Sequence, residues 1–73
     1  MNLLSIKQSI IQSGVKNLKD YGYPSVTPEN ILTDKIYAAF FLGMLNDNLG
    51  VNNQADVVIH DLIDAIKSNE ALN

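Results

Sequence analysis

Residues 36–45 read IYAAFFLGML, and this run contains no charged side chain. Wound as an α-helix, with about 100° between successive residues, the run is apolar on two opposite sides. One side carries Ile36, Phe40 and Met44. The other side carries Ala38, Phe41, Leu42 and Leu45. A helix of this kind needs cover on both sides, so the fold depends on what the rest of the chain can place against it.

The helix that contains this run has two possible starts. The segment Thr27-Pro28-Glu29 supplies a capping hydroxyl, a proline suited to the first helical position and an acid in the first turn. A second start signal follows at Thr33-Asp34. The sequence therefore allows either one unbroken helix over 28–48, or a short turn over 28–32 followed by a main helix over 34–48.

Two further helices are predicted from apolar side chains spaced three, four and seven residues apart, one over 3–20 and one over 54–68. The first presents Leu3, Ile6, Ile10, Val15 and Leu18 to a core. The second presents Val58, Ile59, Leu62, Ile63 and Ile66. Gly14 interrupts the first pattern, which predicts either a close helix contact or a kink that divides the helix. Residues 69–73 are expected to form a frayed tail.

The connections carry recognisable stop signals. Gly22 and Gly50 are placed to adopt the left-handed conformation that ends a helix. Pro24 favours an extended conformation for the residue before it. Tyr21 and Tyr23, on either side of the first glycine, are expected to fold back against the helices, because an aromatic ring with a polar tip suits a half-buried position.

These elements predict an all-α fold, a small three-helix bundle that forms a single domain over 1–73 and packs as a homodimer. In this interpretation Ile36, Phe40 and Met44 face the other two helices. The predicted oligomer interface consists of Ala38, Phe41, Leu42 and Leu45. Two flanking helices cover roughly 200° of a third, and an exposed remainder of Phe and Leu would be adhesive. The alternative is a monomer in which the other two helices and the loop with Tyr21 and Tyr23 cover the central helix completely. The sequence does not distinguish a dimer from a larger oligomer.

Composition excludes several classes of protein. The 73 residues include no Cys, which excludes disulfides and a Cys-ligated zinc site. The N-terminal residues lack the pattern of a signal peptide, and the central apolar run is shorter than the roughly 20 residues of a membrane span. We therefore expect a cytoplasmic protein with no membrane partner.

Charge argues against direct nucleic-acid binding. The net charge is −3, and there is no Arg to bind phosphate or guanine with two hydrogen bonds. The segment Leu49-Gly50-Val51 between two helices invites a helix-turn-helix interpretation, but the helix that follows presents aspartates where a recognition helix presents basic and amide groups. An alternative is an acidic regulator that binds a nucleic-acid-handling protein, with Asp56, Asp61 and Asp64 in place of phosphates.

Chemistry-bearing residues are few. Asp56, His60 and Asp64 recur at intervals of four, a spacing at which carboxylate and imidazole can share a divalent cation. A solvated acidic helix face is the preferred explanation, because one helix offers only these ligands. The one histidine has no serine at a neighbouring helical position, so no nucleophilic triad is indicated. We expect no catalytic residues, no cofactor and no metal.

Three segments, Leu3–Ile11, Tyr21–Pro24 and Thr27–Asp34, resemble a group of small uncharacterised proteins encoded by phages and prophages of Gram-negative bacteria. The resemblance covers most of the chain and carries no known activity. It implies an accessory or assembly role. The expected partners are a second copy of the chain and, as an alternative, another phage or host protein.

Overall fold

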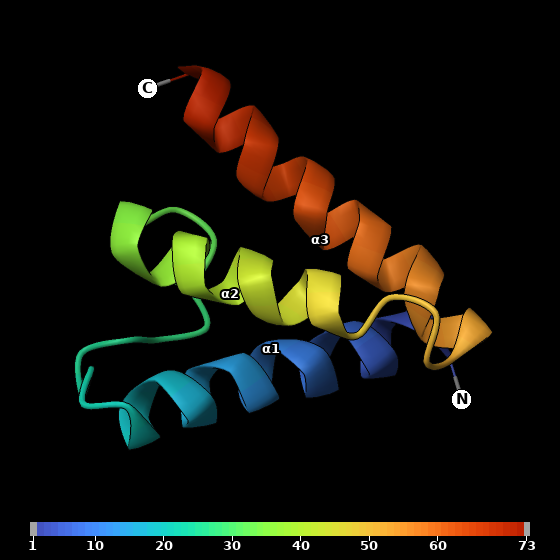
Figure 1. The fold of residues 1–73 in the computed structure, drawn as a ribbon, viewed down its shortest axis with the longest axis horizontal. Coiled ribbons are helices and arrows are strands. Elements are labelled where there is room, and N and C mark those ends of the chain that lie inside the picture. Colours follow the sequence, from blue (N-terminus) through green and yellow to red (C-terminus); the bar gives the residue numbers. More distant parts are fainter. Residues whose placement is uncertain (1, 73) are drawn as a thin grey trace.

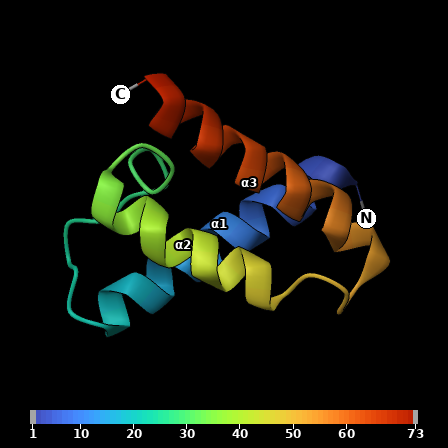
Figure 2. The same ribbon diagram turned by 45° about the horizontal axis from the view of Figure 1, so that its top comes forward.

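The computed structural model describes residues 2–72, and the side chains of residues 2–70. This part of the chain contains three helices and no strand: α1 (Leu3–Asp20), α2 (Lys35–Asp47) and α3 (Asn53–Leu72). Each helix contacts the other two. Figure 1 shows that α1 and α2 run in opposite directions. The first residues of α3 lie near the start of α1, and α3 then diverges from α1; Figure 2 shows the same arrangement turned by 45°. The predicted all-helical class and the number of helices are confirmed.

The start of α2 decides between the two sequence alternatives. Asp34 caps the helix, because its Oδ1 accepts hydrogen bonds from the backbone N–H of Ile36 (2.9 Å) and of Tyr37 (3.2 Å). The earlier signal at Thr27 is also used: its hydroxyl accepts from the N–H of Asn30 (3.1 Å), and the Asn30 side chain accepts from the Thr27 N–H (2.8 Å). That reciprocal pair closes only a series of turns over 28–33, so the second alternative is correct.

Asp34→Ala is expected to destabilise the fold by about 1 kcal/mol, because two backbone donors at the start of α2 lose their acceptor. Urea denaturation followed by circular dichroism measures this loss. Asp34→Asn is the matched control and should lie close to wild type, since Asn caps as well as Asp. Equal losses in the two variants would show that the charge, not the cap, is what matters.

The other boundaries follow the predicted signals with one difference. Gly22 (φ 101°) and Gly50 (φ 86°) both adopt left-handed conformations. At the end of α1, Tyr23 N–H donates to Leu18 O and Gly22 N–H donates to Lys19 O, both at 3.0 Å. This pair of hydrogen bonds forms a Schellman motif. The third helix is longer than the predicted 54–68, because it continues through Leu72 across the segment that was expected to fray. Asn73 lies outside the described residues.

The core lies between all three helices and the segment that connects α1 to α2. All five apolar residues predicted for α3 are buried, whereas Leu3 of α1 is exposed. Val26 and Ile31, from the connecting segment, are buried as completely as any helical residue. The buried apolar side chains are Ile6, Leu18, Val26, Ile31, Ala38, Phe41, Leu45, Val58, Ile59, Leu62, Ile63 and Ile66.

The predicted division of the two sides of α2 is wrong for every residue except Met44, which is half-buried against the core as predicted. Ala38, Phe41 and Leu45, predicted to meet a second chain, are buried within this one, and Phe41 is 0% exposed. Leu42, the fourth predicted interface residue, is half-buried against the same core. Ile36 and Phe40, predicted to face the other helices, are 57% and 46% exposed. Any association through α2 must therefore use the other side of the helix.

Close approach of α1 explains this orientation. A Cβ atom at Gly14 would lie 2.6 Å from Cε1 of Phe41 and 2.9 Å from Cδ1 of Ile31, distances that real Cβ atoms do not tolerate. Gly14 is thus a recess into which the Phe41 ring fits. Of the two predictions for Gly14, the close contact is confirmed, and α1 continues without interruption.

Candidate functional site: the outer face of α2

The solvent side of α2 carries an exposed apolar surface. Ile36, Ala39, Phe40 and Gly43 lie there, all exposed, and we call these four residues the outer face of α2. At about 100° per residue they occupy one continuous arc of the helix. The outer face contains no charged or hydrogen-bonding side chain, so it can associate with another surface only by apolar contact.

Aromatic contacts hold one edge of the outer face in place. The ring of Tyr23 lies 5.4 Å from that of Phe40 and, in an edge-to-face arrangement, 6.0 Å from that of Tyr37. Tyr23 is half-buried, as predicted, while Tyr21 is exposed and does not fold back. Since edge-to-face and offset aromatic pairs add to packing energy, Tyr23 fixes the position of Phe40 without covering it.

Gly43 lies within the outer face and has no role in the fold of a single copy. A Cβ added there would meet no atom within 4 Å, and its φ is not in the left-handed region. A glycine inside a helix costs about 1 kcal/mol relative to alanine. Gly14 gains a close contact in return, whereas Gly43 gains nothing within one chain.

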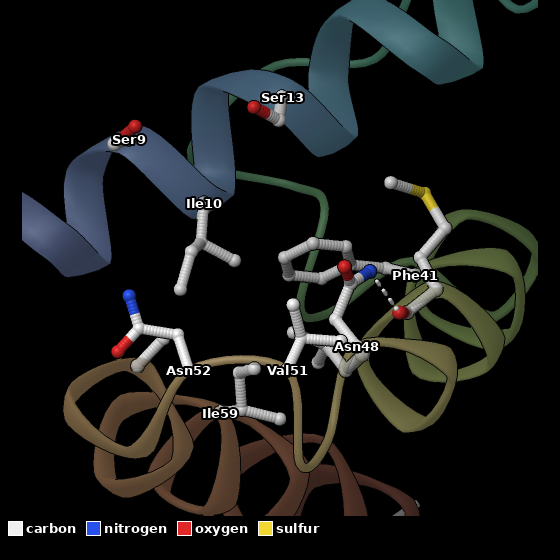
Figure 3. A pocket seen from close by; sticks show the side chains of 11 residues that line it. Ser9, Ile10, Ser13, Phe41, Asn48, Val51, Asn52 and Ile59 are labelled. Carbon is white, nitrogen blue, oxygen red and sulfur yellow. Dashed lines mark hydrogen bonds between the residues drawn. The ribbon is translucent and has the colours of Figure 1, made fainter.

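A pocket opens between α1, the second half of α2, the α2–α3 connection and the start of α3 (Figure 3). Its volume is about 210 Å³, with an apolar floor and a rim of hydroxyl and amide groups from α1 and the α2–α3 connection. At the rim, Asn48 Nδ2 donates to Met44 O at 2.8 Å. The lining residues, all uncharged, are Ser9, Ile10, Ser13, Phe41, Met44, Leu45, Asn48, Val51, Asn52, Ala55 and Ile59. The pocket can accept a small apolar group, and its lining offers no acid or base to act on one.

The structure separates the candidate metal ligands. Asp56 and Asp64 are eight residues apart on α3, about 12 Å along the axis, so one ion cannot contact both. Asp56 already accepts a hydrogen bond from the N–H of Gly50 (3.0 Å), which joins the α2–α3 turn to α3. Among residues 2–72, no group of three His, Cys, Asp or Glu side chains is arranged to hold a metal ion.

The remaining charged groups lie on the surface. His60, Asp61 and Asp64 are exposed on α3. On α1, Lys16 Nζ donates to Asp20 Oδ2 at 2.9 Å, and this hydrogen bond raises the pKa of Lys16 above its usual value. Because both side chains are exposed, the pair is a surface ion pair of the kind that contributes little to stability.

The outer face was missed from the sequence, although a signal for it was present. Wound at 100° per residue, Lys35 and Asp47 fall on the same arc as Ile36 and Gly43. Charged residues at both ends of an arc mark its solvent side, and this arc contains three residues of the outer face and ends beside the fourth, Phe40.

Comparison with known proteins adds no further assignment. Within the described residues, no helix combines the length and apolar character needed to cross a membrane. No protein-family model, no curated protein and no solved structure matches the chain.

Proposed function

We propose that this chain is a non-enzymatic association module that forms a homodimer through the outer face of α2. The observation that carries the proposal is the exposure of Ile36 and Phe40 at 57% and 46%, side by side on a capped and well-packed helix. Burying these side chains would contribute about 25 cal/mol for each Å² of apolar surface removed from water. The assembly role expected from the phage-type resemblance is one form that such a module can take.

Two features of the outer face favour another helix as its occupant. Ala39 and Gly43 are one turn apart and have small or no side chains, so a second helix axis can approach α2 closely there, beside Ile36. The same approach would give Gly43 the contact it lacks within one chain. A two-fold dimer supplies such a helix without requiring a different protein, because the same surface meets itself.

Ile36→Glu is expected to convert the dimer into a monomer with its helices intact. A carboxylate within an apolar contact loses its hydration, while in the free chain Glu is tolerated in the first turn of a helix. Sedimentation equilibrium at micromolar to millimolar concentration should give about twice 8.0 kDa for wild type and 8.0 kDa for the variant.

Val57→Glu is the matched control, since Val57 is an apolar residue of α3 that is 53% exposed and lies outside the outer face. It should remain dimeric. A wild-type chain that stays monomeric over the whole concentration range would contradict the proposal. So would a dimer that withstands Ile36→Glu. Dissociation of the wild-type assembly by salt alone would also contradict it, because apolar association persists at high ionic strength.

A further inference from the structure

The two charged residues at the ends of α2 have the wrong sign for their own helix. Lys35 is the first residue and Asp47 the last, and both are exposed. The N-terminal end of a helix carries a partial positive charge and the C-terminal end a partial negative charge, so each side chain is repelled by the end on which it lies. The carboxylate of the Asp34 cap offsets part of the unfavourable interaction of Lys35 with the N-terminal end of α2. At the C-terminal end, the last turn contains no basic residue that could offset the interaction of Asp47.

These charges border the outer face. Twelve residues separate Lys35 from Asp47, which places them about 120° apart around the axis, with Ile36, Ala39 and Gly43 between them. The outer face is therefore an apolar surface with a cation at one end and an anion at the other. Such a surface is complementary to a copy of itself turned end for end.

We propose that two copies pack through the outer faces of α2 in antiparallel orientation, with Lys35 of each beside the partner's Asp47. This inference rests on the proposed homodimer and adds its orientation. In this arrangement Lys35 lies near the negative end of the second α2, and Asp47 near its positive end, so both unfavourable placements are relieved. The two-fold axis passes beside Ala39 and Gly43, where the helices can approach most closely.

A parallel arrangement of the same faces has none of these advantages. It would place Lys35 beside the partner's Lys35 and Asp47 beside the partner's Asp47, and the two helix dipoles would point the same way. Like charges brought together across an interface oppose association. Charge thus selects the antiparallel dimer, while apolar contact supplies the affinity.

Single charge reversals distinguish the two orientations. In the antiparallel dimer, Lys35→Glu creates two Glu–Asp contacts and Asp47→Lys creates two Lys–Lys contacts, so each variant should have a dissociation constant roughly tenfold higher than wild type at low salt. The effect should shrink in 1 M salt, where the Debye length is about 3 Å. Lys67→Glu is the control, because it changes the net charge equally at an exposed site on α3.

Restoration of affinity identifies the pair. Lys35 and Asp47 of one chain are about 18 Å apart along α2, so they cannot compensate each other within a copy. Either the double variant Lys35→Glu/Asp47→Lys or an equal mixture of the two single variants should recover the wild-type dissociation constant. Single variants that dimerise like wild type, with a mixture that binds more tightly than wild type, would show a parallel dimer and overturn the inference while the homodimer stands. A monomeric wild type would instead overturn the proposed function.

Discussion

Phe41→Ala is expected to remove most of the stability of this domain, whereas Phe40→Ala, one residue earlier, leaves it folded. Phe41 is 0% exposed and fills the recess at Gly14. Truncating a buried Phe to Ala costs about 3–5 kcal/mol. A domain of 73 residues has a free energy of unfolding of roughly 4–11 kcal/mol, so the loss is a large fraction of the total and approaches all of it at the lower end of this range.

Phe40 is the matched control because it has the same side chain on the exposed side of the same helix. The Phe40→Ala variant loses only partly exposed apolar surface and the contact between Phe40 and Tyr23. An aromatic pair contributes about 0.5–1.5 kcal/mol in addition to the burial of its apolar area. Urea denaturation, at a concentration low enough to keep both variants monomeric, isolates the free energy of folding from that of association. A Phe41→Ala variant that stays fully helical and stable while losing only its ability to dimerise would place Phe41 at an interface instead of in the core.

The helix boundaries could be predicted because their signals act over a few residues. Asp34 caps α2 through donors two and three residues ahead, and Gly22 ends α1 through bonds that span one turn. These interactions are local, so the sequence contains all the information needed to place them. The choice between starts at 28 and 34 was less clear because both signals are real, and the structure uses both.

The orientation of α2 could not be predicted in the same way, because it depends on residues distant in sequence. The prediction assigned two helices to cover α2 and expected only the two tyrosines of the connection between α1 and α2 to pack against them. Val26 and Ile31 of that connection are buried, and Ile31 lies close to Gly14 of α1. This additional cover changes which side of α2 can be buried within one chain, and it reverses the predicted interface.

The sequence therefore predicted that α2 has an exposed apolar surface, but it placed this surface on the wrong side of the helix. An apolar surface of α2 does remain exposed, but it consists of Ile36, Ala39, Phe40 and Gly43. Ridge-and-groove packing determines the angle at which helices cross, but it does not determine which side of a helix that is apolar on two sides becomes buried. The recess at Gly14 determines that side, because the Phe41 ring fits into it.

The role of that recess leads to the second prediction: Gly14→Ala should destabilise the domain and Gly43→Ala should stabilise it, although both replace a mid-helix glycine. Each gains up to about 1 kcal/mol from helix propensity. At Gly14 the new methyl group must displace the buried Phe41 ring or Ile31, and overpacking of this kind costs about 1–3 kcal/mol.

At Gly43 the methyl group meets no atom of the same chain, so the gain in propensity is retained and the monomer should be stabilised by about 0.5–1 kcal/mol. Urea denaturation of both variants below the concentration of dimerisation measures the difference. If both were stabilised, Phe41 and Ile31 would have to relax at little cost, and the close contact would not fix α2. The changes in the free energy of unfolding have opposite signs because a glycine weakens a helix wherever it lies, while only at Gly14 does a neighbouring side chain occupy the space left by the missing Cβ.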